Sequence, residues 1–439
     1  MKLLSGGGRV AVQISLAVFM IQACAAYSVL THEQVVDLLW QDRLEPMVKK
    51  RFPDLSDKQL REAHAYAYGG SLVQDMGYYP FGSRYFSDLT HYVRSGDFVV
   101  GLLEESRTAN EYAFALGALA HYAADNSGHP MVNHVVSMEF PSLHRKFGDL
   151  VTYADSPKAH IRAEFGFDMT QVAKNRYTSD RYHDFVGFEI SQGLLERVFP
   201  KVYGIKFDDV VDDEDLAIGT FRHAVSKVIP EMTRVALLNR REEIISDTPN
   251  AAEKKYLYYL SRTEYEKEWG SEYRKPGFGT KILAVLLKLF PKKGPFSGLD
   301  FKVPSQAAED LFIKSIDDTV ESYKQLLVQA EAGTLRLANR DCDTGQETRA
   351  GEYVLSDLTY AHLLDDLSDS DYKQTTPELR QHVLAFYRDP AAPNAMKKKA
   401  KDWKRVLDEV EELKRADTLA EKATGHPAGA PEASHSVEH

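Results

Sequence analysis

Apolar residues recur at spacings of three and four residues over most of the chain, which is the pattern of amphipathic helices. The segments that show it are 33–50, 57–68, 98–122, 189–199, 213–240, 306–332, 352–366, 376–388 and 396–414. Alternation of apolar and polar residues, as in a half-buried strand, is weak, and turn signals are sparse. The pattern therefore predicts an all-α protein.

The first 26 residues have the organisation of a secretory signal peptide. Lys2 and Arg9 precede an apolar stretch over residues 10–20, and small residues follow it up to Ala26. Cleavage after Ala26 would make Tyr27 the first residue of a secreted or periplasmic protein. Downstream of this segment, no run reaches the 18 apolar residues that a membrane-spanning helix needs.

The cysteine content bears on the same N-terminal segment. Cys24 and Cys342 are the only two cysteines. Removal of residues 1–26 would leave Cys342 alone, so no intramolecular disulfide could form. The alternative interpretation of the leader is a lipoprotein anchored through Cys24. It is disfavoured because Gln22 is a poor fit to the small residue usual at that position.

The net charge of the chain bears on its partners, and its composition indicates its domains. The formal net charge is -11, and removing Lys2 and Arg9 with the leader leaves 52 basic and 65 acidic residues, or -13. An acidic protein repels polyanions, so nucleic acid is a disfavoured partner. We expect a catalytic domain over 27–245, a helical C-terminal region over 246–415 and a disordered tail over 416–439.

One part of the C-terminal region, 275–304, is basic and apolar within an acidic protein. Residues 281–293, KILAVLLKLFPKK, combine a run of aliphatic side chains with four lysines. Such a segment is suited to peripheral contact with a membrane surface. The alternative is a core helix followed by a loop rich in proline and glycine.

The segment 112–124 is apolar almost all round, which predicts a buried helix carrying His121 and placing Asp125 where water is scarce. Their spacing of four residues puts both side chains on one helical face, where a divalent cation would compensate the carboxylate. His129 follows four residues later. Because Gly128 and Pro130 flank it, we expect the helix to end or bend there, with His129 on a loop. The alternative is a structural histidine bonded to an aspartate.

Further side chains of ligand type occur nearby in the sequence. His160 and Glu164 form a second pair four residues apart on a predicted helix, and Asp75 and His91 flank the aromatic loop 76–86. Imidazole and carboxylate ligands without thiolate favour zinc, with iron and manganese as the alternatives. The histidines His64, His134, His144 and His183 are interpreted as structural.

Nine residues in chain order resemble the ligand signature of the zinc-dependent phospholipase C family, whose three-zinc site is shared with fungal single-strand nucleases and partly with glycosylphosphatidylinositol-specific phospholipase D. They are Tyr27, His32, Asp75, His91, His121, Asp125, His129, His160 and Glu164. The resemblance implies a multi-helix core of this family with a helical C-terminal extension, and up to three zinc ions. Two departures are tyrosine rather than tryptophan at Tyr27, and three rather than five residues between Asp125 and His129.

The resemblance also implies how the ligands divide. One ion would be held by Asp75, His91, His121 and Asp125. A second would be held by His129, His160 and Glu164. The third would be held by the backbone of Tyr27, by His32 and by a bridging Asp125. Asp75 would also be the candidate general base.

The leading functional hypothesis is hydrolysis of a phospholipid or similar phosphodiester, in which a metal-bound hydroxide oriented by Asp75 attacks phosphorus. Two alternatives stay open: a nuclease with the same metal cluster, and a non-catalytic binding protein that zinc only stabilises. The type of lipid cleavage and the oligomeric state are open as well. Four aromatic residues are predicted to receive a quaternary ammonium head group or to cover the metal cleft: Tyr78, Tyr79, Phe81 and Tyr85.

Overall fold

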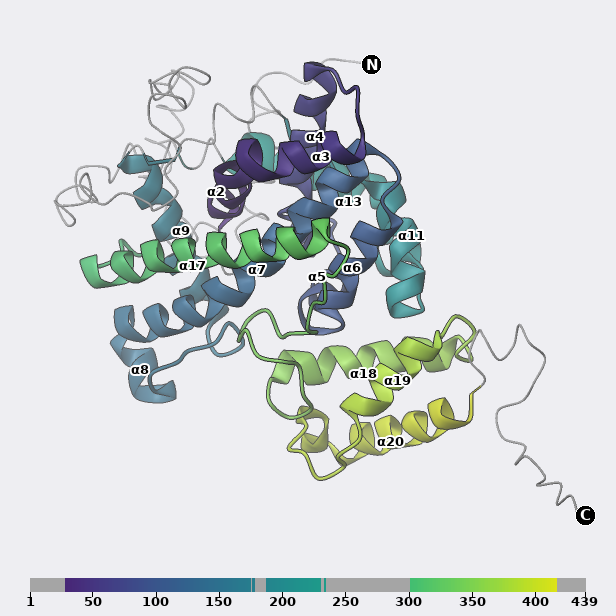
Figure 1. Ribbon diagram of the computed structural model, residues 1–439. Helices are drawn as coiled ribbons and strands as arrows, with labels where there is room; N and C mark the ends of the chain where they lie inside the picture. The colour runs from purple at the N-terminus through teal and green to yellow at the C-terminus, as the bar shows by residue number, and fades with distance from the viewer. Residues whose placement is uncertain (1–27, 175, 178–186, 230–232, 234–300, 417–439) are drawn as a thin grey trace, which may run out of the picture.

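The computed structural model describes residues 28–174, 176–177, 187–229, 233 and 301–416, and their regular structure is helical (Figure 1). Within these ranges, the one strand-type pairing is an isolated bridge between Arg340 and Glu347. The prediction of an all-α fold is confirmed.

Residues 28–174 contain eight α-helices and two short helices of other types. They are α2 (Val29–Leu39), the π-helix η2 (Trp40–Leu44), α3 (Glu45–Arg51), α4 (Asp57–Gly70), the 3-10 helix η3 (Val73–Tyr78), α5 (Arg84–Tyr92), α6 (Ser95–Glu105), α7 (Ala109–Glu139), α8 (Pro141–Phe147) and α9 (Pro157–Ala173).

The part of the chain from residue 187 onward continues the helical architecture. Its described elements are α11 (Gln192–Tyr203), α12 (Phe207–Val210), α13 (Glu214–His223), the π-helix η4 (Ala224–Val228), α17 (Gln306–Glu331), α18 (Val354–Asp369), α19 (Pro377–Phe386), the 3-10 helix η7 (Ala395–Lys398) and α20 (Ala400–Arg415). Figure 1 shows α18, α19 and α20 gathered in one group on the C-terminal side of the molecule.

Helix α7 is the central element, and α4 and α17 make the most extensive contacts with it. In α17, Phe312, Ile316, Val320 and Tyr323 are buried at spacings of three and four residues, so one face of this helix packs into the core. One large hydrophobic cluster runs from α2 to α20, and a smaller one joins the C-terminal half of α7 to the start of α9. The site-bearing helices and the C-terminal helices therefore share one core.

Side-chain caps explain where the principal helices begin. Ser56 and Gln59 form a capping box at the start of α4. Thr108 and Ser305 accept backbone N–H groups at the starts of α7 and α17. Such caps satisfy N–H groups that have no partner within the helix.

Two expectations about α7 are wrong. The apolar stretch 98–122 is two helices, because Thr108 caps a new helix after α6 has ended at Glu105. The helix end expected near Gly128, with His129 on a loop, does not occur, since α7 continues through Pro130 to Glu139. Proline removes one backbone hydrogen bond, and the tertiary packing of α7 on both sides maintains the helix.

Several predicted segments lie outside the described residues. These are the signal peptide 1–26, residues 275–300 of the basic apolar segment 275–304 with its core 281–293, and the tail from 417 onward. Among the helices that are described, none combines the length and apolar character needed to cross a bilayer.

Candidate metal centre

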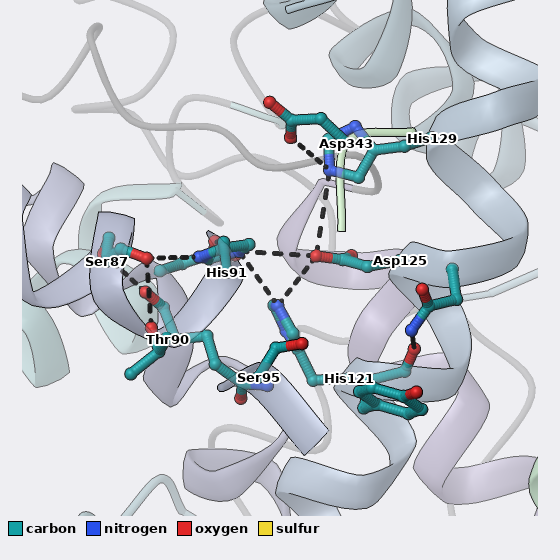
Figure 2. A network of polar contacts seen from close by, with 12 residues as sticks. Ser87, Thr90, His91, Ser95, His121, Asp125, His129 and Asp343 are labelled. Atoms are coloured by element: carbon teal, nitrogen blue, oxygen red, sulfur yellow. Dashed lines mark hydrogen bonds and ion pairs between the residues drawn. The ribbon is translucent and has the colours of Figure 1, made fainter. Parts of the chain in front are cut away.

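Helix α7 places three ligand-type side chains on one buried face. His121, Asp125 and His129 follow at intervals of four residues, and none is more than 1% exposed. Figure 2 shows Asp125 between the three histidines His91, His121 and His129. A carboxylate buried in this way needs positive charge or donors around it.

His91, near the C-terminal end of α5, reaches the same place from a second helix. Its Nε2 lies 3.3 Å from Asp125 Oδ2 and 3.4 Å from Asp75 Oδ1. His121 Nε2 lies 3.0 Å from Asp125 Oδ2 and 3.3 Å from His91 Nε2. Asp75, His91 and His121 thus form one buried group whose ligand atoms are close enough to hold a cation.

Backbone carbonyls fix the orientation of both imidazoles. His91 Nδ1 lies 2.7 Å from the carbonyl oxygen of Ser87, and His121 Nδ1 lies 2.9 Å from that of Ser71. A carbonyl only accepts, so each Nδ1 carries the hydrogen and donates it. In the neutral rings the lone pairs of the two Nε2 atoms then face each other, an arrangement that a cation or proton between them stabilises. Outer hydrogen bonds of this kind are usual for metal-binding histidines.

His32 brings helix α2 to the opposite side of Asp125. Its Nε2 lies 3.5 Å from Asp125 Oδ1, and its ring stacks on that of His121 with centroids 4.3 Å apart. Asp168 of α9 holds the preceding turn, accepting hydrogen bonds from the Leu30 backbone N–H at 3.0 Å and the Thr31 hydroxyl at 2.7 Å. His32, His121 and Asp125 form a second group able to hold a cation.

A third group combines His129 of α7 with two residues of α9. His160 Nδ1 lies 3.4 Å from Glu164 Oε1, while His160 Nε2 lies 2.6 Å from the Val151 carbonyl and donates its hydrogen there. Nδ1 is therefore the nitrogen that a metal would use. Within the described part of the chain, neither Glu164 oxygen accepts a hydrogen bond. His129, His160 and Glu164 are all buried.

The separations among these atoms match pairs of ligands on one ion. Zinc bonds to nitrogen and oxygen are about 2.0–2.2 Å long, so two ligands in a tetrahedral arrangement lie roughly 3.3 Å apart. A charge-assisted hydrogen bond is shorter, about 2.7–2.9 Å. The observed distances from Asp125 to His121, His91 and His32 are 3.0, 3.3 and 3.5 Å. The donor set of imidazole and carboxylate groups without thiolate fits zinc.

Asp125 and the histidines around it change one another's pKa values. Burial disfavours protonation of His91 and His121, but the neighbouring Asp125 and Asp75 carboxylates outweigh it and raise the pKa of both histidines. Burial also opposes ionisation of Asp125, yet the surrounding histidines lower its pKa well below the ordinary value. This centre therefore strongly favours a negative Asp125 with positive charge next to it.

For the candidate ligands farther from this centre, burial is the main cause of the change in pKa. Desolvation lowers the pKa of His32 and of His160, which keeps both imidazoles neutral and able to bind a metal. Desolvation raises the pKa of Glu164 well above its usual range. A buried cation would reverse the last effect because it favours the carboxylate form.

The structure brings together eight of the nine residues of the predicted ligand set, and Tyr27 lies outside the described residues. His129 projects from the continuous helix α7, so the expectation that it approaches from a loop is wrong. Its spacing of four residues from Asp125 follows directly from the helical repeat.

Among the predicted substrate-binding aromatic residues, Tyr78 borders the centre. Its ring centroid lies 6.0 Å from that of His91 and 6.4 Å from that of Tyr153. Tyr153 in turn packs edge-on against His160 at 6.0 Å. Sequence reasoning missed Tyr153, which lies in a short loop without a periodic pattern.

The other three aromatic residues contact other parts of the chain or solvent, and their role toward a substrate stays a prediction. Tyr79 is buried against Phe221, and Phe81 is 60% exposed. Tyr85 stacks on His362 of α18. The loop between η3 and α5 carries Tyr79 and Phe81 and turns sharply, and Phe81 has a positive φ of 65°. Neighbours in sequence are thus directed to different parts of the molecule.

Sequence reasoning also missed Asp343, a buried carboxylate in the loop between α17 and α18. Its Oδ1 lies 3.4 Å from His129 Nε2 (Figure 2). The segment around it, NRDCDTG, has no helical spacing and no neighbouring histidine. Its acidic character was the only available signal.

Histidines interpreted as structural are placed as follows. His64 Nε2 lies 3.0 Å from Asp37 Oδ1 in a separate buried network. His144 Nδ1 pairs with the Ser137 hydroxyl at 2.9 Å, and His134 is exposed. His183 lies outside the described residues. None of the three described histidines belongs to the metal-type groups found in the described chain.

Comparison with known families agrees with this geometry. Residues 31–206 match the family model described as zinc dependent phospholipase C. This stretch runs from α2 to just beyond α11, and the match confirms the resemblance to the zinc-dependent phospholipase C family that was found in the sequence. The family and the three buried groups of histidine and carboxylate together fit a zinc-dependent hydrolase. No curated protein and no solved structure matches the chain.

Proposed function

We propose that this chain is an exported zinc-dependent phosphodiester hydrolase that acts on phospholipid or a similar diester. The observation that carries the proposal is the surrounding of one buried carboxylate by four imidazoles. The Nε2 atoms of His32, His91, His121 and His129 lie between 3.0 and 3.7 Å from an Asp125 oxygen. Such a cluster is costly without cations and suited to bind several of them.

Bound zinc would supply positive charge for the phosphate oxygens and lower the pKa of a coordinated water to about 7. Asp125 would bridge two ions, since Oδ1 faces His32 and Oδ2 faces His91 and His121. Asp75 would accept the proton of the attacking water. No donor within the described chain hydrogen-bonds to its Oδ1, and this oxygen faces His91.

Processing of the N-terminus is part of the proposal. Cleavage after Ala26 would give Tyr27 a free amino group five residues before His32. The turn between them is anchored to Asp168 through Leu30 and Thr31. We propose that Tyr27 and His32 share the ion on the Oδ1 side of Asp125.

The choice of a lipid substrate rests on charge. A processed chain with a net charge of -13 would repel a polyanionic nucleic acid at long range. A zwitterionic phospholipid carries no net charge and escapes this repulsion. Tyr78 and Tyr153 beside the centre offer aromatic faces to a cationic head group.

The test is metal analysis of correctly processed protein, combined with assays on phosphatidylcholine, glycosylphosphatidylinositol and single-stranded DNA. We expect bound zinc and hydrolysis of at least one lipid. Asp125→Ala should release metal and reduce turnover by at least about 10³-fold, because charge stabilisation of the transition state depends on the cluster.

Asp37→Asn is the matched control, since Asp37 is another buried carboxylate paired with a histidine but lies outside the cluster. Folded Asp37→Asn protein should retain zinc and activity. Hydrolysis of DNA but not of lipid would favour the nuclease. Zinc without hydrolysis of any diester would favour a non-catalytic role. Full zinc and full turnover in Asp125→Ala would refute the assignment.

A further inference from the structure

The loop between α17 and α18 reaches the metal centre from outside the family-matched segment. Asp343 in this loop is 3% exposed, and its Oδ1 lies 3.4 Å from His129 Nε2. The matched segment ends at residue 206, so the family does not assign this carboxylate. Figure 2 shows Asp343 directed at His129 on the side away from His121.

The orientation of the Asp343 side chain is fixed from behind. Its Oδ2 accepts hydrogen bonds from the Tyr92 hydroxyl at 2.9 Å and from the Tyr353 hydroxyl. Asp341 Oδ1 accepts the backbone N–H of Asp343 at 2.9 Å. These bonds hold one carboxylate oxygen and leave the other directed at His129.

The loop backbone is attached to α5 and α7, the helices that carry His91 and His129. The Cys342 N–H donates to the His91 carbonyl at 3.1 Å, and Asn133 Nδ2 donates to the Asp343 carbonyl at 2.8 Å. Gly345, with a φ of 69°, allows the loop to approach α7 closely. A Cβ atom there would lie 2.8 Å from the Asn126 carbonyl oxygen. The loop is therefore built against α5 and α7.

The distance distinguishes two roles for this carboxylate. A direct charge-assisted hydrogen bond to His129 would be about 2.7–2.9 Å long, whereas two ligands of one zinc ion lie roughly 3.3 Å apart. The 3.4 Å between Asp343 Oδ1 and His129 Nε2 agrees with the second arrangement. It equals the 3.4 Å between His160 Nδ1 and Glu164 Oε1 in the same group.

We propose that Asp343 is a further protein ligand of the ion held by His129, His160 and Glu164. The inference rests on the zinc assignment of the proposed function and extends it to a residue of the C-terminal region. A fourth side chain would occupy a position that catalytic zinc sites usually leave to water or substrate. Tyr92 and Tyr353 are positioning residues, since they act through Asp343.

The test compares zinc-loaded wild-type protein with Asp343→Asn. Asparagine keeps the volume of aspartate and removes its charge. We expect competition with a chromogenic chelator to show one ion bound at least about tenfold more weakly, with the others unchanged. Tyr353→Phe should produce a smaller loss. Asp357→Asn is the control, because Asp357 is a buried carboxylate of α18 that accepts from Gly351, Asn394 and Ala395.

Anomalous diffraction from crystals of the zinc-loaded protein separates a ligand from an outer partner. The proposal expects Asp343 Oδ1 within about 2.2 Å of an ion. An oxygen more than about 3 Å from every ion, or unchanged zinc affinity in Asp343→Asn, would overturn it. Either of these two results would leave the proposed function standing as long as the wild-type protein binds zinc. Wild-type protein that binds no zinc would instead defeat the proposed function.

Discussion

Individual residues of the centre fall into two kinds, those directed at the shared cluster and those that hold them there. Ser71, Ser87 and Val151 contribute only backbone carbonyls, yet these carbonyls determine which nitrogen of His121, His91 and His160 faces the cluster. Mutation of a side chain cannot easily remove such a contact. Asp168 is different, because its side chain anchors the turn before His32.

Asp168 gives a prediction about pH. Burial raises its pKa to about 6, above the value of about 3.9 for an exposed aspartate. Its contribution to stability is therefore fully present below about pH 4 and is lost as the pH rises through 6. Relative to Asp168→Asn, the free energy of unfolding of the wild type should fall by about 1–2 kcal/mol between about pH 5 and about pH 7.5. Urea denaturation of both proteins measures this difference.

Thr31→Val provides the control for Asp168. It removes the hydroxyl that donates to Asp168 Oδ1 but leaves the carboxyl group able to titrate. The difference in the free energy of unfolding between Thr31→Val and the wild type should depend much less on pH. Parallel pH profiles for wild type and Asp168→Asn would contradict the raised pKa.

The two kinds of residue differ in how far the sequence predicts them. His121 with Asp125, and His160 with Glu164, were identifiable because a helical repeat brings side chains four residues apart onto one face. Asp343 was not, because it lies in a loop and its place beside His129 depends on tertiary packing. The position of a loop carboxylate cannot be derived from periodicity.

At the scale of secondary structure elements, the crossing of α4 and α7 sets the position of His121. A Cβ atom at Gly117 of α7 would lie 2.0 Å from the Ala67 carbonyl oxygen, and one at Gly70 of α4 would lie 1.9 Å from that of Phe114. The helices thus cross in backbone contact. The Ser71 carbonyl, just after α4, accepts from His121 Nδ1.

Gly117→Ala should therefore disturb both stability and metal binding. The added methyl group meets backbone atoms that cannot move without separating α4 from α7. We expect a loss of about 1–3 kcal/mol or more in the free energy of unfolding. Zinc content should fall as well, because the Ser71 carbonyl would move away from His121. Chemical denaturation and metal analysis measure the two effects.

Gly219 of α13 is the matched control. A Cβ atom built there has no heavy atom within 4 Å. Gly219→Ala should stabilise the protein by up to about 1 kcal/mol, because alanine favours the helix, and should leave zinc content unchanged. Equal effects of the two substitutions would show that the close crossing has no special role.

Element boundaries were predictable where caps and periodicity agree. The pattern 306–332 corresponds to α17 (Gln306–Glu331), whose start is capped by Ser305. The division at residues 106–108 was missed because apolar spacing continues across it, and only the Thr108 cap marks the new helix. Pro130 led to the opposite error, a helix end that does not exist, since packing on both sides maintains α7 through this residue.

At the scale of the whole molecule, the C-terminal helices are part of the structure that supports the centre. The Tyr323 hydroxyl of α17 donates to the Leu116 carbonyl of α7 at 2.8 Å. Phe312 stacks on Phe167 of α9, with ring centroids 4.5 Å apart. The buried Glu309 pairs with Lys174 and Arg176, which follow α9. A division between 27–245 and 246–415 stays a prediction, but α17 shares the core of the first part.

This packing predicts the outcome of truncation. A chain ending at residue 300 retains the whole family-matched segment but loses α17, so the apolar faces of α7 and α9 would be exposed to water. Since both helices carry candidate ligands, the shortened protein should fail to form a cooperative fold and should bind little zinc. Circular dichroism during thermal unfolding and metal analysis test this.

A chain ending at residue 416 keeps every helix described and should behave like the full protein. A cooperatively folded, zinc-loaded chain ending at residue 300 would show instead that the family segment is an independent domain, and that α17 is not needed to support the centre.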